Sequence, residues 1–163
     1  MIRIALLVAT SLIFGAYSIG VAASSEDFLL TAGRAGPVKI GMTPEQVESI
    51  FGKARIKRVD EQYEGMPSPA LEIFADSNET KSALLVLDLD GGLVYRVNVK
   101  DPRYKTKEGI GVGSFLSELQ KRCHEGPPKE EGEGFYGIID AKMGMSFAIS
   151  YDSSPVVASV LVL

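Results

Sequence analysis

The sequence predicts an α+β fold: two similar units, each with a short arm, a short helix and three to four antiparallel strands, forming one compact domain after a signal peptide. Two observations lead to it. The stretches Gly36–Gly52 and Gly109–Cys123 share an apolar arm, a glycine and an apolar stripe at helical spacing. Short apolar runs separated by turn residues follow each stretch, which is typical of antiparallel strands.

Residues 1–23 have the composition of a cleavable export signal. Arg3 precedes the apolar stretch Ile4–Ile19, and small residues occupy Val21–Ala23, so we expect cleavage near Ala23. The stretch is about as long as the roughly 20 residues of a spanning helix, so an uncleaved anchor is the alternative. We predict a periplasmic or secreted protein with no membrane span after signal cleavage.

Charge and cysteine content narrow the class of protein. The chain has 17 basic and 21 acidic residues, a net charge of −4, and removal of Arg3 makes it more negative. Without a basic stripe, nucleic acid and anionic lipid are not expected partners. Cys123 is the only cysteine, so no internal disulfide forms and a packed core must supply the stability. Its place in the helical stripe favours a buried thiol.

Glycine and proline divide the chain into segments. Gly36-Pro37 and Asp101-Pro102 interrupt any regular structure, and a polar connector, Arg103–Glu108, follows the second break. The predicted segments are a signal peptide at 1–23, a lead-in at 24–36, a first helix-sheet module at 37–102 and a second module at 103–163.

The first helix has a complete set of start signals. Thr43 is the predicted N-cap, Pro44 takes the first helical position, and Gln46 completes a capping box. The helix is expected to end at Phe51, before Gly52. Because it has only about two turns, it must pack on the sheet.

The second helix is predicted by comparison with the first. Aligning Gly41 with Gly113 places Val47 opposite Leu119, on the apolar face of each helix. Ser114 is the predicted N-cap, and no Glu or Gln lies three positions later.

Apolar runs and the turns between them predict the strands. Asp90-Gly91-Gly92 is a hairpin turn; it is not followed by the further ligands of a calcium loop. The charged stretch Lys129–Gly134 is expected to be a loop, and the nearly all-apolar terminal run an inner strand. The arm and strands are predicted at Val38–Ile40, Arg55–Asp60, Ala70–Ala75, Ala83–Leu89, Leu93–Lys100, Phe135–Ile139, Met145–Tyr151 and Val156–Leu163.

The two opening stretches resemble a motif of exported bacterial modules. "GPVKIGMTPEQVESIFG" resembles G-x-x-x-x-G-M-T-x-x-x-V, which leads into a short helix and a meander, and "TKEGIGVGSFLSEL" resembles the second opening motif of tandem versions. The module is similar to that of β-lactamase-inhibitor-like proteins and of the small lipoprotein of the outer-membrane barrel-assembly machinery. This resemblance implies a sheet that presents a face to another protein, and it carries over no binding residues.

The sequence shows no set of residues typical of catalysis. His124 is the only histidine, which excludes a multi-histidine metal site. Cys123 is its neighbour, and neighbouring side chains on a helix point about 100° apart, so the two do not form a predicted catalytic pair. We predict a non-catalytic protein without cofactor or metal, and the least favoured alternative is an enzyme that uses Cys123.

Binding to another protein is the leading prediction. A sheet with helices on one face leaves its other face for a partner, and tyrosine, methionine and arginine are common at interfaces. The partner is expected to be an envelope or secreted protein, with this chain as an inhibitor, immunity factor or envelope-assembly accessory. The alternative is a small-molecule or cell-wall-fragment binder with a pocket between the modules. The predicted binding residues, two of them in an expected exposed loop at Tyr63–Pro69, are Tyr63, Met66, Arg96, Tyr104 and Tyr136.

Overall fold

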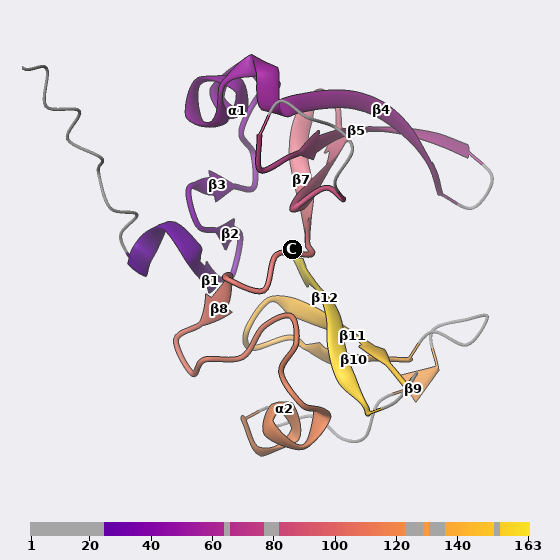
Figure 1. The fold of residues 1–163 in the computed structure, drawn as a ribbon. Coiled ribbons are helices and arrows are strands. Elements are labelled where there is room, and N and C mark those ends of the chain that lie inside the picture. Colours follow the sequence, from indigo (N-terminus) through magenta and orange to yellow (C-terminus); the bar gives the residue numbers. More distant parts are fainter. Residues whose placement is uncertain (1–24, 64–65, 77–81, 123–128, 131–135, 152–153) are drawn as a thin grey trace, which may run out of the picture.

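Two antiparallel meanders share one eight-stranded sheet, in the order β4-β5-β6-β7-β12-β11-β10-β9 (Figure 1). The computed structural model describes residues 25–63, 66–76, 82–122, 129–130, 136–151 and 154–163, and has the predicted α+β class. The strands are β4 (Ile56–Tyr63), β5 (Met66–Ile73), β6 (Leu85–Asp90), β7 (Leu93–Val99), β9 (Lys129–Glu130), β10 (Tyr136–Asp140), β11 (Met145–Ser150) and β12 (Val156–Val162).

The two units join through the last strand of each. In the antiparallel pair of β7 and β12, Val99 lies opposite Val160 and Val97 opposite Val162. All four valines are fully buried. The nearly all-apolar terminal run is therefore an inner strand, as predicted, and the core continues from one unit into the other.

A second, smaller sheet lies beside the first and has the order β3-β2-β1-β8. Its strands are β1 (Leu29–Thr31), β2 (Arg34–Ala35), β3 (Val38–Lys39) and β8 (Lys105–Thr106), and a short 3-10 helix, η1 (Ser25–Phe28), precedes them. Because β8 pairs in parallel with β1, the lead-in and the connector between the units are tied together. Neither segment was predicted to contain a strand.

The first helix, α1 (Pro44–Phe51), has the predicted capping box. The backbone N–H of Thr43 donates to Gln46 Oε1 at 2.9 Å, and the backbone N–H of Gln46 donates to Thr43 Oγ1 at 3.4 Å. A short 3-10 helix, η2 (Lys53–Arg55), follows after Gly52.

The predicted cap of the second helix, α2 (Leu116–Arg122), was wrong. The backbone N–H of Phe115 donates to Glu118 Oε2 at 3.1 Å, which places the cap one residue later than Ser114. The Ser114 hydroxyl instead accepts from the backbone N–H of Gly111 at 3.1 Å, within the arm. Phe115 and Glu118 therefore correspond to Thr43 and Gln46, and only the glutamate half of the capping box is present.

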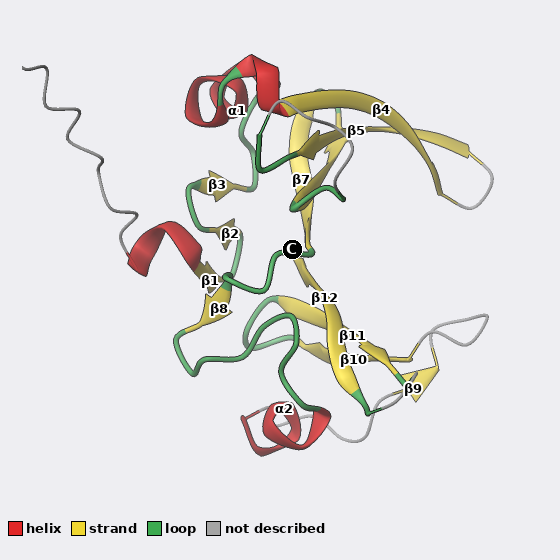
Figure 2. Cartoon of the chain, in the orientation of Figure 1, coloured by secondary structure: helices red, strands yellow, loops and turns green. Residues whose placement is uncertain are grey.

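Both helices and the small sheet cover the same face of the large sheet (Figure 2). Val47 of α1 and Leu119 of α2, which the sequence alignment pairs, are both fully buried. Buried and partly exposed residues alternate along β11, which is typical of a strand with one face toward a core.

The two units attach their arms to the sheet in the same way. The N–H of Gly41 donates to Val94 O at 2.7 Å, and the N–H of Gly113 donates to Val157 O at 2.8 Å. Each valine N–H donates back, at 2.9 Å, to the residue after the glycine. Both glycines have positive φ, 86° and 82°, which explains why glycine occupies this position in both stretches.

Two boundary predictions were wrong. The predicted loop at Tyr63–Pro69 was wrong for its described residues, because Tyr63 ends β4, residues 66–69 begin β5, and Tyr63 lies opposite Met66. Pro67 and Pro69 are tolerated because β6 pairs with β5 only from Ala70 onward, so this end of β5 has one neighbour. Part of the predicted Lys129–Gly134 loop is β9, which pairs with β10.

The signal peptide, Cys123 and His124 lie outside the described residues, and their predicted roles stay predictions. Within the described ranges, no helix is long and apolar enough to cross a membrane.

Candidate functional site

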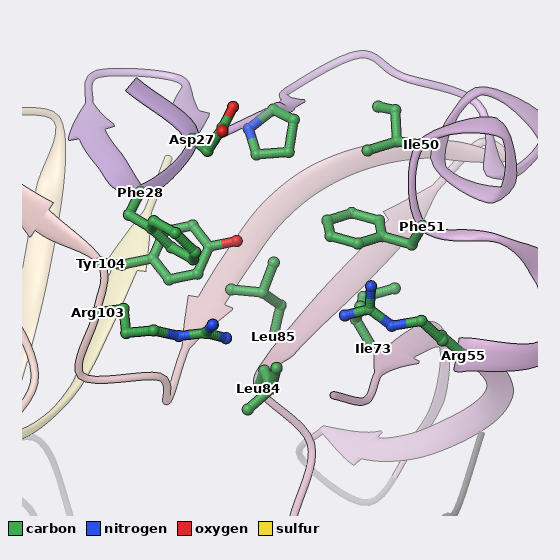
Figure 3. Close-up of a pocket in the computed structure, with 11 residues that line it drawn as sticks. Asp27, Phe28, Ile50, Phe51, Arg55, Ile73, Leu84, Leu85, Arg103 and Tyr104 are labelled. Atoms are coloured by element: carbon green, nitrogen blue, oxygen red, sulfur yellow. The ribbon is translucent and has the colours of Figure 1, made fainter. Parts of the chain in front are cut away.

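A cavity of about 530 Å³ opens between the first unit, η1 and the start of the connector (Figure 3). We call it the α1 pocket. Most of its lining belongs to the predicted first module, 37–102, with Asp27 and Phe28 from the lead-in and Arg103 and Tyr104 from the start of the second module, 103–163. It is lined by Asp27, Phe28, Pro37, Ile50, Phe51, Arg55, Ile73, Leu84, Leu85, Arg103 and Tyr104.

The floor of the α1 pocket is the apolar face of the sheet. Ile73 of β5 lies opposite Leu85 of β6, and both are about 1% exposed. The short α1 ends above them, where Phe51 is half-buried and Ile50 is 40% exposed. An apolar molecule in the pocket would therefore cover surface that the helix leaves open.

Tyr104 is held tightly at one end of the pocket. It is only 4% exposed, and its ring packs edge to face on Phe28, with 5.2 Å between the ring centroids. A Cβ atom on Gly36 would lie 2.9 Å from Tyr104 Cε1, and one on Gly111 would collide with the carbonyl oxygen of Tyr104. Gly36 thus allows close packing on the ring, and Gly111 allows a close approach to the Tyr104 backbone.

The Tyr104 hydroxyl points into the α1 pocket (Figure 3). No hydrogen-bond partner for it lies within the described residues. Burial raises the pKa of Tyr104 to about 12, with a smaller contribution from Asp101, so the hydroxyl is neutral at physiological pH and is available as a donor. Because the hydroxyl faces the open pocket, an acceptor atom of a bound ligand could replace water as its hydrogen-bond partner.

Two arginines line the pocket, and they differ in their ion pairs and hydrogen bonds. Arg103 makes a two-pronged ion pair with the buried Asp101, at 2.6 Å for the shortest contact, and lies 4.6 Å from the Phe28 ring centroid. The hydrogen bond to Asp101 raises the pKa of Arg103. Within the described part of the chain, the Arg55 side chain donates only through Nε, to Phe74 O at 2.8 Å, and its guanidinium lies 5.6 Å from the Phe51 ring centroid.

The ionisation of Tyr104 gives a testable pH dependence. The folded pKa is about 12 and the ordinary value is near 10, so between pH 10 and pH 12 the unfolded chain loses a proton that the folded chain keeps. The contribution of Tyr104 to the free energy of unfolding is therefore complete below pH 10 and is lost as the pH rises toward 12. In urea unfolding at pH about 9 and about 11.5, the wild type should lose more stability than Tyr104→Phe. Equal losses in the two proteins would contradict the assignment.

The other predicted binding residues do not join Tyr104 at this pocket. Tyr63 and Met66 lie at the end of the β4–β5 hairpin, and their side chains are outside the described part. Arg96 Nε makes an ion pair with the buried Asp88 at 2.5 Å. Tyr136 packs on Tyr151 in the second unit, with 5.1 Å between ring centroids.

The face of the large sheet opposite the helices has an uncharged row of residues. Neighbouring strands place Asn98 opposite Leu161, Leu161 opposite Ser146, and Ser146 opposite Ile139. Ile139 is 58% exposed, and the other three are partly exposed. We call these four residues the open-face row.

Among the described residues, no group of three or more histidine, cysteine, aspartate or glutamate side chains is placed to hold a metal ion. The polar atoms at the α1 pocket are two guanidiniums, a tyrosine hydroxyl and the Asp27 carboxylate. These groups suit recognition by hydrogen bonds and charge.

The fold has a known counterpart. No family model matches the chain, and no curated protein sequence matches it. The crystal structure of the uncharacterized protein YfeY from Escherichia coli is similar, with a TM-score of 0.56 and 11% sequence identity over 82% of this chain and 95% of that one. At this identity the likeness shows the fold alone. The resemblance to inhibitor and barrel-assembly modules therefore stays a prediction.

Proposed function

We propose that the protein is an exported, non-catalytic binding protein that holds a small amphipathic molecule in the α1 pocket. One observation carries the proposal: the hydroxyl of the buried Tyr104 points into the α1 pocket, above an apolar floor, and has no partner among the described residues. A ligand with an acceptor atom and an apolar body matches both features.

The size and lining of the α1 pocket support this function. Ligand sites in proteins commonly enclose about 300–1,000 Å³ and combine apolar walls with a few polar groups. The α1 pocket is about 530 Å³, with an aliphatic floor and the aromatic rings of Phe28, Phe51 and Tyr104 around it. The composition of residues 1–23 supports export, because it is that of a cleavable signal.

A matched pair of variants tests the proposed site. The neutral dye N-phenyl-1-naphthylamine has the size and the apolar body of the expected ligand, so it probes the apolar part of the pocket, and the chain has no tryptophan to interfere with its fluorescence. Leu84→Trp adds a bulky ring to the pocket, so we expect it to weaken dye binding at least tenfold. Leu161→Trp makes the same change in the open-face row and should leave the affinity within about twofold. A wild type that does not bind the dye, or two variants with equal affinity, would refute the proposal.

A second candidate function is binding to an envelope protein through the open-face row. The row is uncharged, partly exposed and not covered by the helices, which favours a protein contact. The same two variants separate this function from the first. A partner cross-linked in envelope extract should be lost with Leu161→Trp and retained with Leu84→Trp if the sheet face binds it, and the reverse result would exclude this face.

A further inference from the structure

We infer that the α1 pocket is selective for anionic amphiphiles, which have a compact apolar body and one carboxylate or sulfonate, and that Arg55 binds the charged group. This inference rests on the proposed function and adds the chemical class of the ligand. It depends on a difference between the two arginines at the pocket: Arg103 is paired with Asp101, whereas Arg55 has donors that no described residue uses.

Arg55 has donors to spare. A guanidinium carries five N–H donors. Nε–H is used on Phe74 O, and the terminal nitrogens have no hydrogen-bond partner among the described residues. The Nε contact fixes the side chain, so that its guanidinium faces the pocket beside Phe51 (Figure 3). The terminal N–H groups, held in this orientation, can donate to the oxygens of a carboxylate or sulfonate.

Arg103 differs from Arg55 in this respect. Its Nε and one terminal nitrogen both donate to Asp101, at 3.0 Å and 2.6 Å. The Asp101 carboxylate offsets the positive charge of Arg103 and accepts from two of its nitrogens. A ligand anion at Arg103 would have to compete with a buried partner, so we assign anion binding to Arg55.

Asp27 sets the orientation of the ligand. Its carboxylate lies at the end of the pocket away from Arg55, and the Tyr104 hydroxyl points into the space between them (Figure 3). An anionic group is therefore favoured at the Arg55 end and repelled from the Asp27 end. The apolar body then lies along Leu85, toward the rings of Phe28 and Tyr104.

Two dyes that differ by one sulfonate test the inference. Anilinonaphthalene sulfonate is N-phenyl-1-naphthylamine with an added sulfonate, so the ratio of their affinities measures the preference for the charge. The wild type should prefer the sulfonate dye. Arg55→Gln should weaken binding of the sulfonate dye about tenfold or more, as expected for a charge-assisted hydrogen bond, and change the neutral dye by less than about twofold.

A control and a rescue variant accompany Arg55→Gln. Lys53→Gln removes the same charge from η2 at an exposed residue that does not line the pocket, and it should change neither affinity by more than about twofold. Arg55→Lys keeps the charge and should retain the preference for the sulfonate dye. It also keeps the test valid if Arg55→Gln does not fold.

The outcomes separate this inference from the proposed function. If the wild type binds both dyes equally, or if Arg55→Gln weakens both dyes equally, the anion selectivity is wrong while the pocket remains a binding site. If the wild type binds neither dye, both the proposed function and the inference fail. If Lys53→Gln weakens the sulfonate dye as much as Arg55→Gln does, the preference is a general charge effect and Arg55 has no special role.

Discussion

Phe147→Ala is expected to lower the free energy of unfolding by about 3–5 kcal/mol. Phe147 is fully buried at the centre of β11, where it lies opposite Ile138 of β10 and Val160 of β12. Truncation removes a large apolar side chain and leaves a cavity that rigid strands on both sides cannot fill. Urea unfolding followed by circular dichroism measures the loss.

Phe115→Ala is the matched control, because this phenylalanine of the same unit is 54% exposed. Its truncation should change the free energy of unfolding by no more than about 0.5 kcal/mol. Similar losses for the two variants would mean that the second unit is packed differently from the structure described above.

Gly36→Ala is expected to destabilise the protein by about 3 kcal/mol, from steric overlap and left-handed strain together. A Cβ atom there would collide with the carbonyl oxygen of Asp27 and lie 2.9 Å from the Tyr104 ring, and φ is +56°. Because Asp27 and Tyr104 both line the α1 pocket, the same variant should weaken binding of N-phenyl-1-naphthylamine.

Gly33→Ala separates the cost of left-handed backbone strain from the cost of steric overlap by a Cβ atom. Gly33 has a similar φ of +68°, and a Cβ atom there would meet nothing within 4 Å. We expect a loss of only about 1–2 kcal/mol and unchanged dye binding. If urea unfolding shows equal losses for Gly33→Ala and Gly36→Ala, the close packing of Gly36 on Tyr104 contributes nothing.

Elements with strong local signals could be predicted from the sequence. The capping box at Thr43 and Gln46 places α1 correctly, and the turn at Gly91-Gly92 joins β6 to β7 because both glycines have positive φ. The cap of α2 was predicted wrongly at Ser114 because serine is a common cap residue, whereas phenylalanine at position 115 offers no side-chain acceptor. The Ser114 hydroxyl accepts from Gly111, a contact that depends on the path of the arm.

Pairing between distant short segments could not be predicted. β1 and β8 pair over two residues each, which is too short to show a period, and 73 residues separate the ends of the strands. Their pairing brings the connector, with Tyr104, next to the lead-in.

The candidate site was only partly visible in the sequence for the same reason. Tyr104 was predicted as a binding residue from its type. Phe28, Arg55 and Leu84 come from other segments, and only the tertiary structure brings them to Tyr104. Gly111 was a local clue, since a glycine inside an extended segment often marks a close approach of the backbone, whereas Gly36 lies in the turn between β2 and β3.

The two units differ where the pocket forms. The alignment that pairs Gly41 with Gly113 places Ile50 of α1 opposite Arg122 of α2. Ile50 lines the pocket, whereas Arg122 is charged and exposed. The repeated architecture therefore supplies the scaffold, and side chains particular to the first unit supply the candidate site.

Methyl NMR during a titration with anilinonaphthalene sulfonate tests the central claim, that the α1 pocket is the binding site. Isotope labels on isoleucine and leucine methyl groups report on the pocket and on the open-face row in one spectrum. We predict shifts for the pocket residues Ile50, Ile73, Leu84 and Leu85. The methyl signals of Ile139 and Leu161 should not move. Shifts at Ile139 and Leu161 with unchanged pocket signals would contradict the claim and place binding on the open sheet face.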